Sequence, residues 1–146
     1  MFLGTYEPRL DDKGRLILPA RFREELAEGL VITKGHERCL YVWPVAEFAR
    51  VAGELGRAPT ASGTARDVLR VFYAGAVDAI PDKQGRVLVP HSLRDYAGLD
   101  RGNRDCVVLG GNTHVELWAA ATWHDYLAEH ERSFARLSEE VLPGLS

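Results

Sequence analysis

Two short segments carry the residues whose types and spacing could do chemistry, and both follow the pattern Asp-x-x-Gly-Arg. The first runs from Asp11 to Arg15 and the second from Asp82 to Arg86. An Asp that begins a tight turn accepts hydrogen bonds from the turn amides, and its carboxylate can orient an Arg four residues later. Because a guanidinium matches phosphate and guanine in geometry, each segment predicts a turn that could bind nucleic acid.

The glycines and lysines of the two turns fit the same interpretation. Gly14 and Gly85 can take the positive φ that a tight reversal of the chain requires. Lys13 and Lys83 lie within the turns and could meet phosphates, although they are 70 residues apart rather than the 71 that separates the other pairs. A hairpin turn with an ordinary surface ion pair better explains a single copy, because such pairs are common and weak. For two copies, a nucleic-acid site and a duplicated structural turn both remain open.

Positive charge is concentrated around the two turns rather than spread over the chain. The 146 residues carry 18 Lys and Arg against 21 Asp and Glu, a formal net charge of −3 that does not suggest a strongly basic nucleic-acid binder. Residues 9–23 nevertheless hold five cations and two anions, and residues 82–104 hold five cations and three anions. The segment from Thr113 onward holds six acids and two arginines. A local positive patch matters more for phosphate binding than the total charge.

The chain is organised as two copies of one unit. Residues 2–4 match residues 73–75 at the same offset of 71 that relates the turns. After an insertion around residues 100–104, an offset of 75 aligns Trp43 with Trp118. Repeated Trp residues before equivalent helices are expected to anchor the core rather than to stack on bases.

Each unit is predicted to contain a strand, the turn, a second strand, a short helix with Pro19 or Pro90 at its first position, two more strands and a closing helix. A linker over residues 57–63 is expected to lead into a helix over 64–72 with Thr64 as its N-cap. The predicted strands are 4–9, 15–18, 30–33 and 40–43 in the first unit and 75–80, 86–89, 106–109 and 114–118 in the second, with closing helices within 45–55 and 123–141.

Other classes of protein are disfavoured. No apolar run approaches the roughly 18 residues of a spanning helix, and the N-terminus has no signal-peptide pattern, so we expect a cytoplasmic protein. Cys39 and Cys106 are too few for a disulfide scaffold and are expected to be buried thiols. The histidines lack metal-ligand spacing and no convergent catalytic set is visible. We therefore expect no enzyme activity, catalytic residue, metal, cofactor, membrane contact or small-molecule substrate.

With these motifs in place, the sequence resembles, almost end to end, the MraZ family, bacterial transcriptional regulators encoded at the start of the division and cell wall gene cluster. Two Asp-x-x-x-Arg motifs with the right separation and flanks make the resemblance specific. The matching residues are 1–4, 10–16, Leu18, Pro19, Arg23, Arg66, Arg70, 72–76, Asp82, 85–87, Pro90, 116–118 and Trp123.

The resemblance implies an α+β, mainly β fold of tandem duplicated SpoVT/AbrB-like units, each a small swapped-hairpin-type β-barrel with short helices. It divides the chain into unit 1 (1–56), a linker and connecting helix (57–72) and unit 2 with the C-terminal helix (73–146). It also implies ring-shaped homo-oligomers, associated with the nucleoid, that bind short direct repeats of double-stranded DNA in the promoter of their own operon.

The resemblance also assigns the site. Arg15 and Arg86 match the family's DNA-binding arginines, and Asp11 and Asp82 match its aspartates. Gln84 and His91 stand where the first unit has Lys13 and Ala20, so the two units are expected to contact DNA unequally. The predicted DNA-binding residues are Lys13, Arg15, Lys83 and Arg86, supported by Asp11, Gly14, Asp82 and Gly85.

The alternative function is an AbrB-like antitoxin, which binds DNA and neutralises a toxin with its tail. Such proteins usually have one unit per chain and a disordered acidic tail. Here there are two units, and residues 122–141 have the apolar spacing of a helix. Recovery of a stable toxin partner in a pull-down would favour this alternative.

Overall fold

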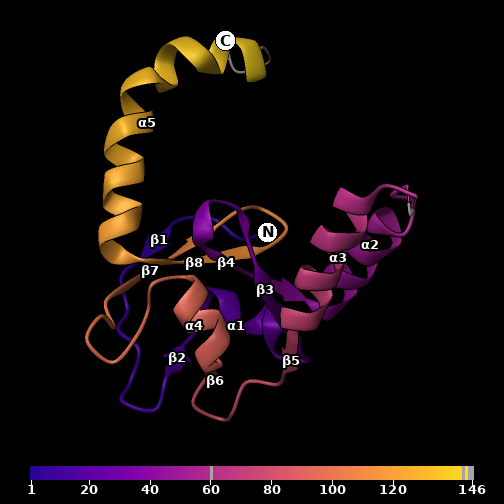
Figure 1. Cartoon of the computed structure of the whole chain (residues 1–146). Helices are drawn as coiled ribbons and strands as arrows, with labels where there is room; N and C mark the ends of the chain where they lie inside the picture. Colours follow the sequence, from indigo (N-terminus) through magenta and orange to yellow (C-terminus); the bar gives the residue numbers. More distant parts are fainter. Residues whose placement is uncertain (60, 143, 145–146) are drawn as a thin grey trace.

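The computed structural model of the chain describes residues 1–59, 61–142 and 144 and has a mixed α and β architecture (Figure 1). The predicted linker contains residue 60, and the predicted second unit contains residues 143 and 145–146, which lie outside the described residues. The elements are β1 (Thr5–Tyr6), β2 (Arg15–Ile17), α1 (Ala20–Leu26), β3 (Leu30–Lys34), the 3-10 helix η1 (His36–Arg38), β4 (Leu40–Pro44), α2 (Val45–Leu55), α3 (Gly63–Gly75), β5 (Val77–Ala79), β6 (Arg86–Leu88), α4 (His91–Tyr96), β7 (Cys106–Gly110), β8 (Val115–Ala119) and α5 (Ala120–Val141).

A six-stranded antiparallel sheet unites the two sequence repeats. Its strand order is β1-β7-β8-β4-β3-β5, so the β3–β4 hairpin of the first repeat joins the β7–β8 hairpin of the second through β4 and β8. Within the described residues the sheet is open, with β1 and β5 at its edges. The mainly antiparallel α and β architecture is confirmed, whereas the closed barrel is not, and the unit boundaries 1–56, 57–72 and 73–146 stay a prediction.

A separate two-stranded ribbon pairs β2 of the first repeat with β6 of the second. Leu16 lies opposite Val87 at its centre, and both side chains are buried. Because side chains alternate along a strand, the neighbours Ile17 and Leu88 point to the other face, where they are 51% and 54% exposed. The ribbon therefore has one face in the core and one face in solvent.

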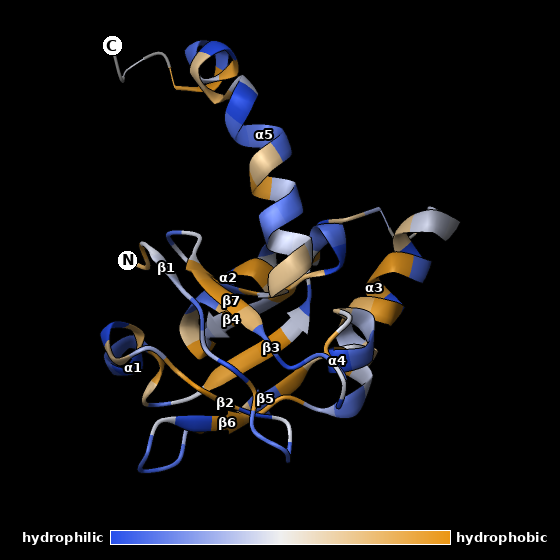
Figure 2. Cartoon of the chain, turned by 90° about the vertical axis from the view of Figure 1, so that its left-hand side faces the viewer, coloured by the Kyte–Doolittle hydropathy of each residue, from blue (hydrophilic) through white to orange (hydrophobic). Residues whose placement is uncertain are grey.

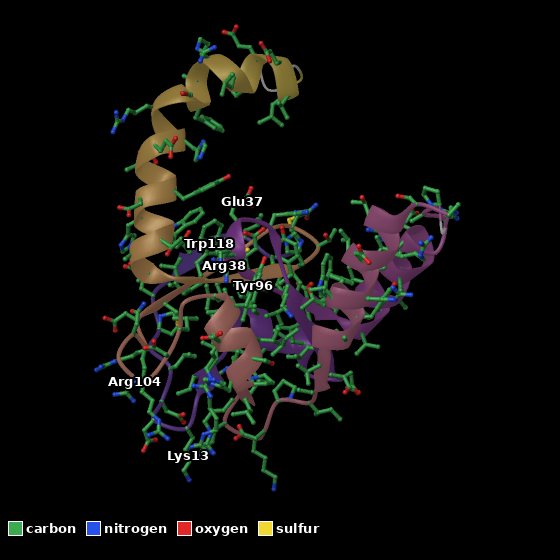
Figure 3. The ribbon with its side chains drawn as sticks, viewed as in Figure 1. Lys13, Glu37, Arg38, Tyr96, Arg104 and Trp118 are labelled. Atoms are coloured by element: carbon green, nitrogen blue, oxygen red, sulfur yellow. The ribbon has the colours of Figure 1, made fainter. Side chains whose placement is uncertain are left out.

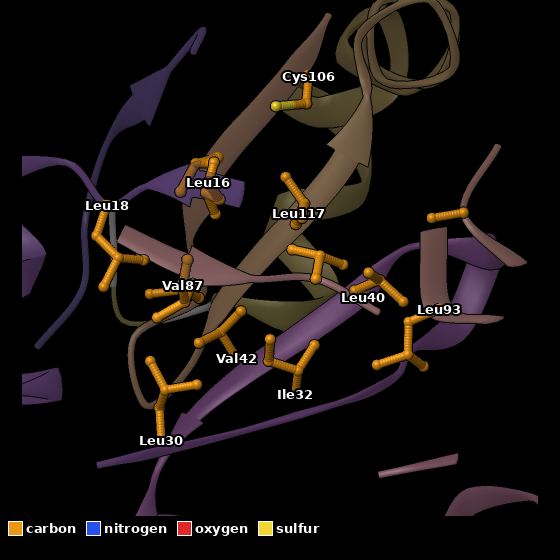
Figure 4. Packing of buried hydrophobic residues seen from close by; sticks show 14 of the residues in the cluster. Leu16, Leu18, Leu30, Ile32, Leu40, Val42, Val87, Leu93, Cys106 and Leu117 are labelled. Atoms are coloured by element: carbon orange, nitrogen blue, oxygen red, sulfur yellow. The ribbon is translucent and has the colours of Figure 1, made fainter. Parts of the chain in front are cut away.

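The hydrophobic core draws on both repeats. Figure 4 shows Leu16 and Val87 of the ribbon among buried residues of the large sheet, including Ile32, Val42 and Leu117. Burying a side chain of this size contributes about 1.5–3 kcal/mol each, so the shared core is what holds the ribbon against the sheet.

Three local predictions are wrong in detail. The first strand spans only Thr5–Tyr6, and Pro8 two residues later has no N–H to extend the pairing. Pro19 and Pro90 are N-cap residues, one position before the predicted one. Ser62 rather than Thr64 caps α3, because its hydroxyl accepts a hydrogen bond from the Ala65 N–H at 3.2 Å.

The helices lie outside the sheet. Trp43 and Trp118 are buried, which confirms their predicted role as core anchors. The α2–α3 pair is held by the stacked rings of Phe48 and Phe72, whose centroids lie 6.2 Å apart. The long α5 is attached at its start, where Trp123 packs on Trp118, and it then extends away from the sheet (Figures 1 and 2).

Candidate nucleic-acid interface

The first Asp-x-x-Gly-Arg segment forms a tight turn closed by its own aspartate. One oxygen of Asp11, Oδ1, accepts hydrogen bonds from the backbone N–H groups of Lys13 (2.9 Å) and Arg15 (2.8 Å). The other oxygen, Oδ2, accepts one from Nε of Arg15 at 2.6 Å. Gly14 has a φ of 80°. The carboxylate therefore shapes the turn and orients the arginine, as the sequence predicted.

The second segment repeats this geometry. Asp82 Oδ1 accepts from the backbone N–H groups of Gln84 and Arg86, both at 2.9 Å, and Oδ2 accepts from Nε of Arg86 at 2.8 Å. Gly85 has a φ of 76°. Gln84 takes the place of Lys13 in this network through its backbone alone, so the change of side chain leaves the turn intact.

The hydrogen bonds keep both carboxylates ionised. The backbone N–H of Arg15, assisted by its side chain, lowers the pKa of Asp11 to about 2. The backbone N–H of Arg86 likewise lowers the pKa of Asp82. Within the described residues each guanidinium uses only Nε for its aspartate, so that bond leaves the terminal nitrogens, which can form a fork toward phosphate or guanine, unused.

The ribbon brings the two arginines onto one surface. In its register Arg15 lies opposite Leu88 and Ile17 lies opposite Arg86. Residues opposite each other in an antiparallel pair point to the same face, so both arginines and both half-exposed aliphatic side chains share the solvent face. We call this surface of Arg15, Ile17, Arg86 and Leu88 the ribbon face.

A second arginine from each repeat locks the opposite turn. Arg23 Nε donates to the Leu18 carbonyl (2.9 Å), and its guanidinium covers Gly85, where a Cβ would lie 2.5 Å from Nε. Arg94 makes the equivalent contacts with the Val89 carbonyl (2.8 Å) and Gly14. Sequence reasoning missed this use of the glycines. The feature of the sequence that could have indicated this contact is the recurrence of Arg23 as Arg94 at the offset of 71.

The predicted lysines lie at the tips of the turns and are exposed. The side chains of Lys13 and Lys83 make no ion pair within residues 1–59, 61–142 and 144. Figure 3 shows Lys13 at the end of the molecule that lies farthest from α5. The structure thus places all eight predicted site residues in the two turns at the ends of one ribbon.

Other reactive side chains are placed differently. Cys39 and Cys106 are buried free thiols, and burial raises the pKa of Cys106 to about 12. Among the described residues, no group of three or more His, Cys, Asp or Glu could hold a metal ion. No helix in the described part of the chain is long and apolar enough to cross a membrane.

Comparison with known proteins gives a consistent result. The model of the family described as "MraZ protein, putative antitoxin-like" matches twice, over residues 1–71 and 72–142. Proteins named transcriptional regulator MraZ from Thermobifida fusca and Kocuria rhizophila are 59% and 60% identical over 145 residues, which cover 99% of both chains. One from Salinispora arenicola is 61% identical and is covered completely.

Replacing Gly85 by Ala tests the contact between Arg23 and the opposite turn. Ala at a positive φ costs about 1–2 kcal/mol anywhere, and at Gly85 it must also displace Arg23 from the Leu18 carbonyl. Gly98→Ala is the matched control, because Gly98 has a φ of 72° and open space around it. We expect Gly85→Ala to lower the free energy of unfolding by about 1 kcal/mol more than Gly98→Ala, measured by urea denaturation.

A double variant completes this test. Arg23→Ala removes the obstructing side chain, so the combined variant is expected to lose less stability than the sum of the two single changes. Strict additivity would show that Arg23 does not press on Gly85.

Acid titration tests the turn itself. The pKa of Asp11 is about 2 in the folded protein against 3.8 for an unperturbed side chain. A lowered pKa stabilises the fold above about pH 4, and this contribution is lost as the pH falls from 3.8 toward 2. We expect the carboxyl carbon of Asp11 to titrate near pH 2 by NMR, together with the amide shifts of Lys13 and Arg15. Amide shifts that keep the same step in Asp11→Asn would contradict this assignment.

Proposed function

The chain belongs to the MraZ family, and on this premise we propose that it is a transcriptional regulator that binds promoter DNA with its ribbon face. The family is one of regulators rather than enzymes. The observation that carries the proposal is the pair of arginines that their own aspartates hold on one exposed face.

A two-stranded ribbon fits the major groove of B-form DNA, where base pairs present distinct patterns of donors and acceptors. The guanidinium forks of Arg15 and Arg86 can each bind the O6 and N7 atoms of a guanine. Between them, Ile17 and Leu88 offer apolar surface for thymine methyl groups. Lys13 and Lys83 reach outward from the turns, where the phosphates would lie.

Restraint of the arginines supports the proposal further. A free arginine loses much of its rotamer entropy when it binds. The bond between Arg15 Nε and Asp11 restricts those rotamers before DNA arrives, and the bond between Arg86 and Asp82 does the same. Part of the cost of ordering is therefore met by the fold, which favours affinity.

The cross-pairing of β2 and β6 supports the finer proposal of a SpoVT/AbrB-like, swapped-hairpin-type fold. Each strand follows the turn of its own repeat but pairs with the strand of the other. A duplicated chain therefore achieves in one polypeptide the exchange of strands that single units would achieve as a dimer.

We further propose that the chain forms ring-shaped homo-oligomers on short direct repeats in the promoter of its own division and cell wall operon, and so associates with the nucleoid. With a net charge of −3, one subunit has few phosphate contacts, and several linked subunits gain affinity through effective concentration. The acidic α5 leaves the sheet on the side away from β2 and β6 (Figure 1). Its negative charges therefore do not repel DNA bound at the ribbon face.

Two unmatched apolar surfaces support self-association. A groove of about 600 Å³ between the sheet, α2 and α3 is lined mainly by apolar side chains, including Trp43, Leu55 and Val68. On α5, Leu127, Phe134, Leu137 and Val141 recur at helical spacing and remain exposed. Five acids and two arginines make α5 acidic, and the groove lining has one cation and one anion, Lys34 and Asp67, so apolar burial rather than charge favours this contact. If α5 of one subunit fills the groove of the next, the contact is head-to-tail, the type that closes into rings.

The antitoxin alternative keeps one supporting observation, which is the family description "putative antitoxin-like". The C-terminal segment is helical from Ala120 to Val141 rather than a disordered tail. Co-purification from native cells, followed by identification of any stoichiometric partner, separates this function from promoter binding alone.

Removal of either arginine from the ribbon face is expected to weaken promoter binding. A bidentate pair of arginine and guanine contributes about 1–3 kcal/mol, so Arg15→Ala and Arg86→Ala should each reduce affinity about tenfold or more, compounded over the bound subunits. The measurement is fluorescence anisotropy with DNA from upstream of the protein's own gene. Arg132→Ala on α5 removes the same charge far from the ribbon and should bind like the original protein. Unchanged affinity for both ribbon variants would exclude this face.

A charge in the apolar stripe of α5 is expected to break the oligomer. Phe134 is 58% exposed, so Phe134→Asp should leave the subunit folded while it prevents burial of the stripe in a groove. Light scattering should then give a smaller mass, and affinity for an array of repeats should fall toward that for a single repeat. Arg136→Ala, two residues away on another side of the helix, is the control. An unchanged mass for Phe134→Asp would rule out α5 as the interface.

A further inference from the structure

The two repeats differ in the loop that follows the short helix after each ribbon strand. Three residues (27–29) connect α1 to β3, whereas nine residues (97–105) connect α4 to β7. The longer connection contains the insertion recognised in the sequence and carries two arginines, Arg101 and Arg104. We call residues 97–105 the arginine loop.

The arginine loop is held in a defined shape. Asp100 pairs with Asn103 in a short bridge, and Asp100 Oδ1 accepts a hydrogen bond from the Gly102 N–H at 2.9 Å. The side-chain amide of Asn103 donates to the Gly98 carbonyl, also at 2.9 Å. The end of the loop is fixed to the N-terminal segment, because the Leu10 N–H donates to the Arg104 carbonyl at 3.0 Å.

This shape brings the loop of the second repeat to the turn of the first. Arg101, Arg104 and Asp12 line one recess of about 420 Å³. Within the described part of the chain, Arg101 and Arg104 make no ion pair, unlike Arg50 and Arg57, which pair with acids on α2. Two guanidinium groups and one carboxylate line the recess, so its lining carries a net positive charge. Arg104 lies on the same side of the molecule as Lys13 (Figure 3).

The corresponding connection of the first repeat, residues 27–29, contains no Arg or Lys. In the strands the ribbon is symmetric: Leu16 lies opposite its own repeat equivalent, Val87, so half a turn about this pair exchanges the two motifs, whose turns differ in charge only where Asp12 corresponds to Lys83 and Lys13 to Gln84. A symmetric ribbon would bind DNA equally well in either orientation. Direct repeats, however, require every subunit to face the same way.

We propose that the arginine loop is a phosphate-binding arm, in which Arg101 and Arg104 hold the DNA backbone beside the first turn and so fix the direction of each subunit on its site. This inference rests on the proposed function. Its ligand is the phosphodiester backbone, which both arginines contact without reading sequence. The first turn therefore makes more phosphate contacts than the second.

The salt dependence of binding tests the arm. Each phosphate contact contributes about 0.9 to the slope of log K against log salt, so Arg101→Ala with Arg104→Ala should lower the slope by about 1 to 2 for each bound subunit. Affinity for promoter and scrambled DNA should fall by the same factor. Replacement of both residues by Lys keeps the charge and should restore the slope. Arg132→Ala with Arg136→Ala on α5 removes equal charge as the control.

The outcomes separate this inference from the proposed function. If the original protein binds promoter and scrambled DNA equally, the proposed function fails. If it prefers the promoter but the loop variant keeps the slope of the α5 control, only the arm is overturned. Circular dichroism checks that the loop variants are folded. The variant with Lys at both positions shows whether the change in salt slope follows the loss of positive charge.

Direction is tested with a cleaving iron chelate attached at Gly102→Cys, since Cys39 and Cys106 are buried and will not be labelled. A single promoter repeat should be cut on one side only. With Arg101→Ala and Arg104→Ala added, cuts should appear on both sides. Cuts on both sides in the presence of both arginines would overturn the proposed role in direction.

Discussion

The pairing of β2 with β6 is the interaction on which the candidate site depends. Each strand has three residues, and a two-stranded ribbon of this size is not stable alone in water. It persists because Leu16 and Val87 enter a core that both repeats build. The position of Arg15 relative to Arg86 is therefore set by packing across the whole molecule, although each arginine is oriented by an aspartate only four residues away.

This division between local and distant forces explains what the sequence could predict. The bonds of Asp11 stay within its own turn, so residue type and spacing were sufficient to derive them. The contact of Arg23 with Gly85 joins residues 62 apart, and no local pattern encodes it. The same holds for the meeting of both motifs on one ribbon. The closed barrel stays unconfirmed, and strand patterns alone could not decide it, because whether β1 and β5 meet depends on sheet twist.

Charge is distributed so that an acidic chain can present a basic face. Salt screens exposed charges beyond about 8 Å, so the acids of α5 weaken DNA binding only if they lie near the ribbon. The fold places α5 on the other side of the sheet (Figure 1). Of the acids in the two turns, Asp11 and Asp82 are each matched to an arginine by charge-assisted hydrogen bonds, whereas Asp12 lines the recess with Arg101 and Arg104. Asp11 and Asp82 orient the guanidinium groups and also offset their charge, so the net positive charge around the ribbon comes from Lys13, Lys83 and the further arginines of each repeat.

Duplication within one chain also permits a difference that two identical chains could not have. In a symmetric dimer of single units, any substitution or insertion appears on both sides of the ribbon at once. Here the two copies can change separately: Lys13 corresponds to Gln84, Asp12 corresponds to Lys83, and only the second repeat carries the longer connection. The closely packed core positions of the ribbon change only between aliphatic residues, Leu16 corresponding to Val87 and Leu18 to Val89. Changes of charge and length, in contrast, occur in the turns, in the connection before β7 and in the closing helix.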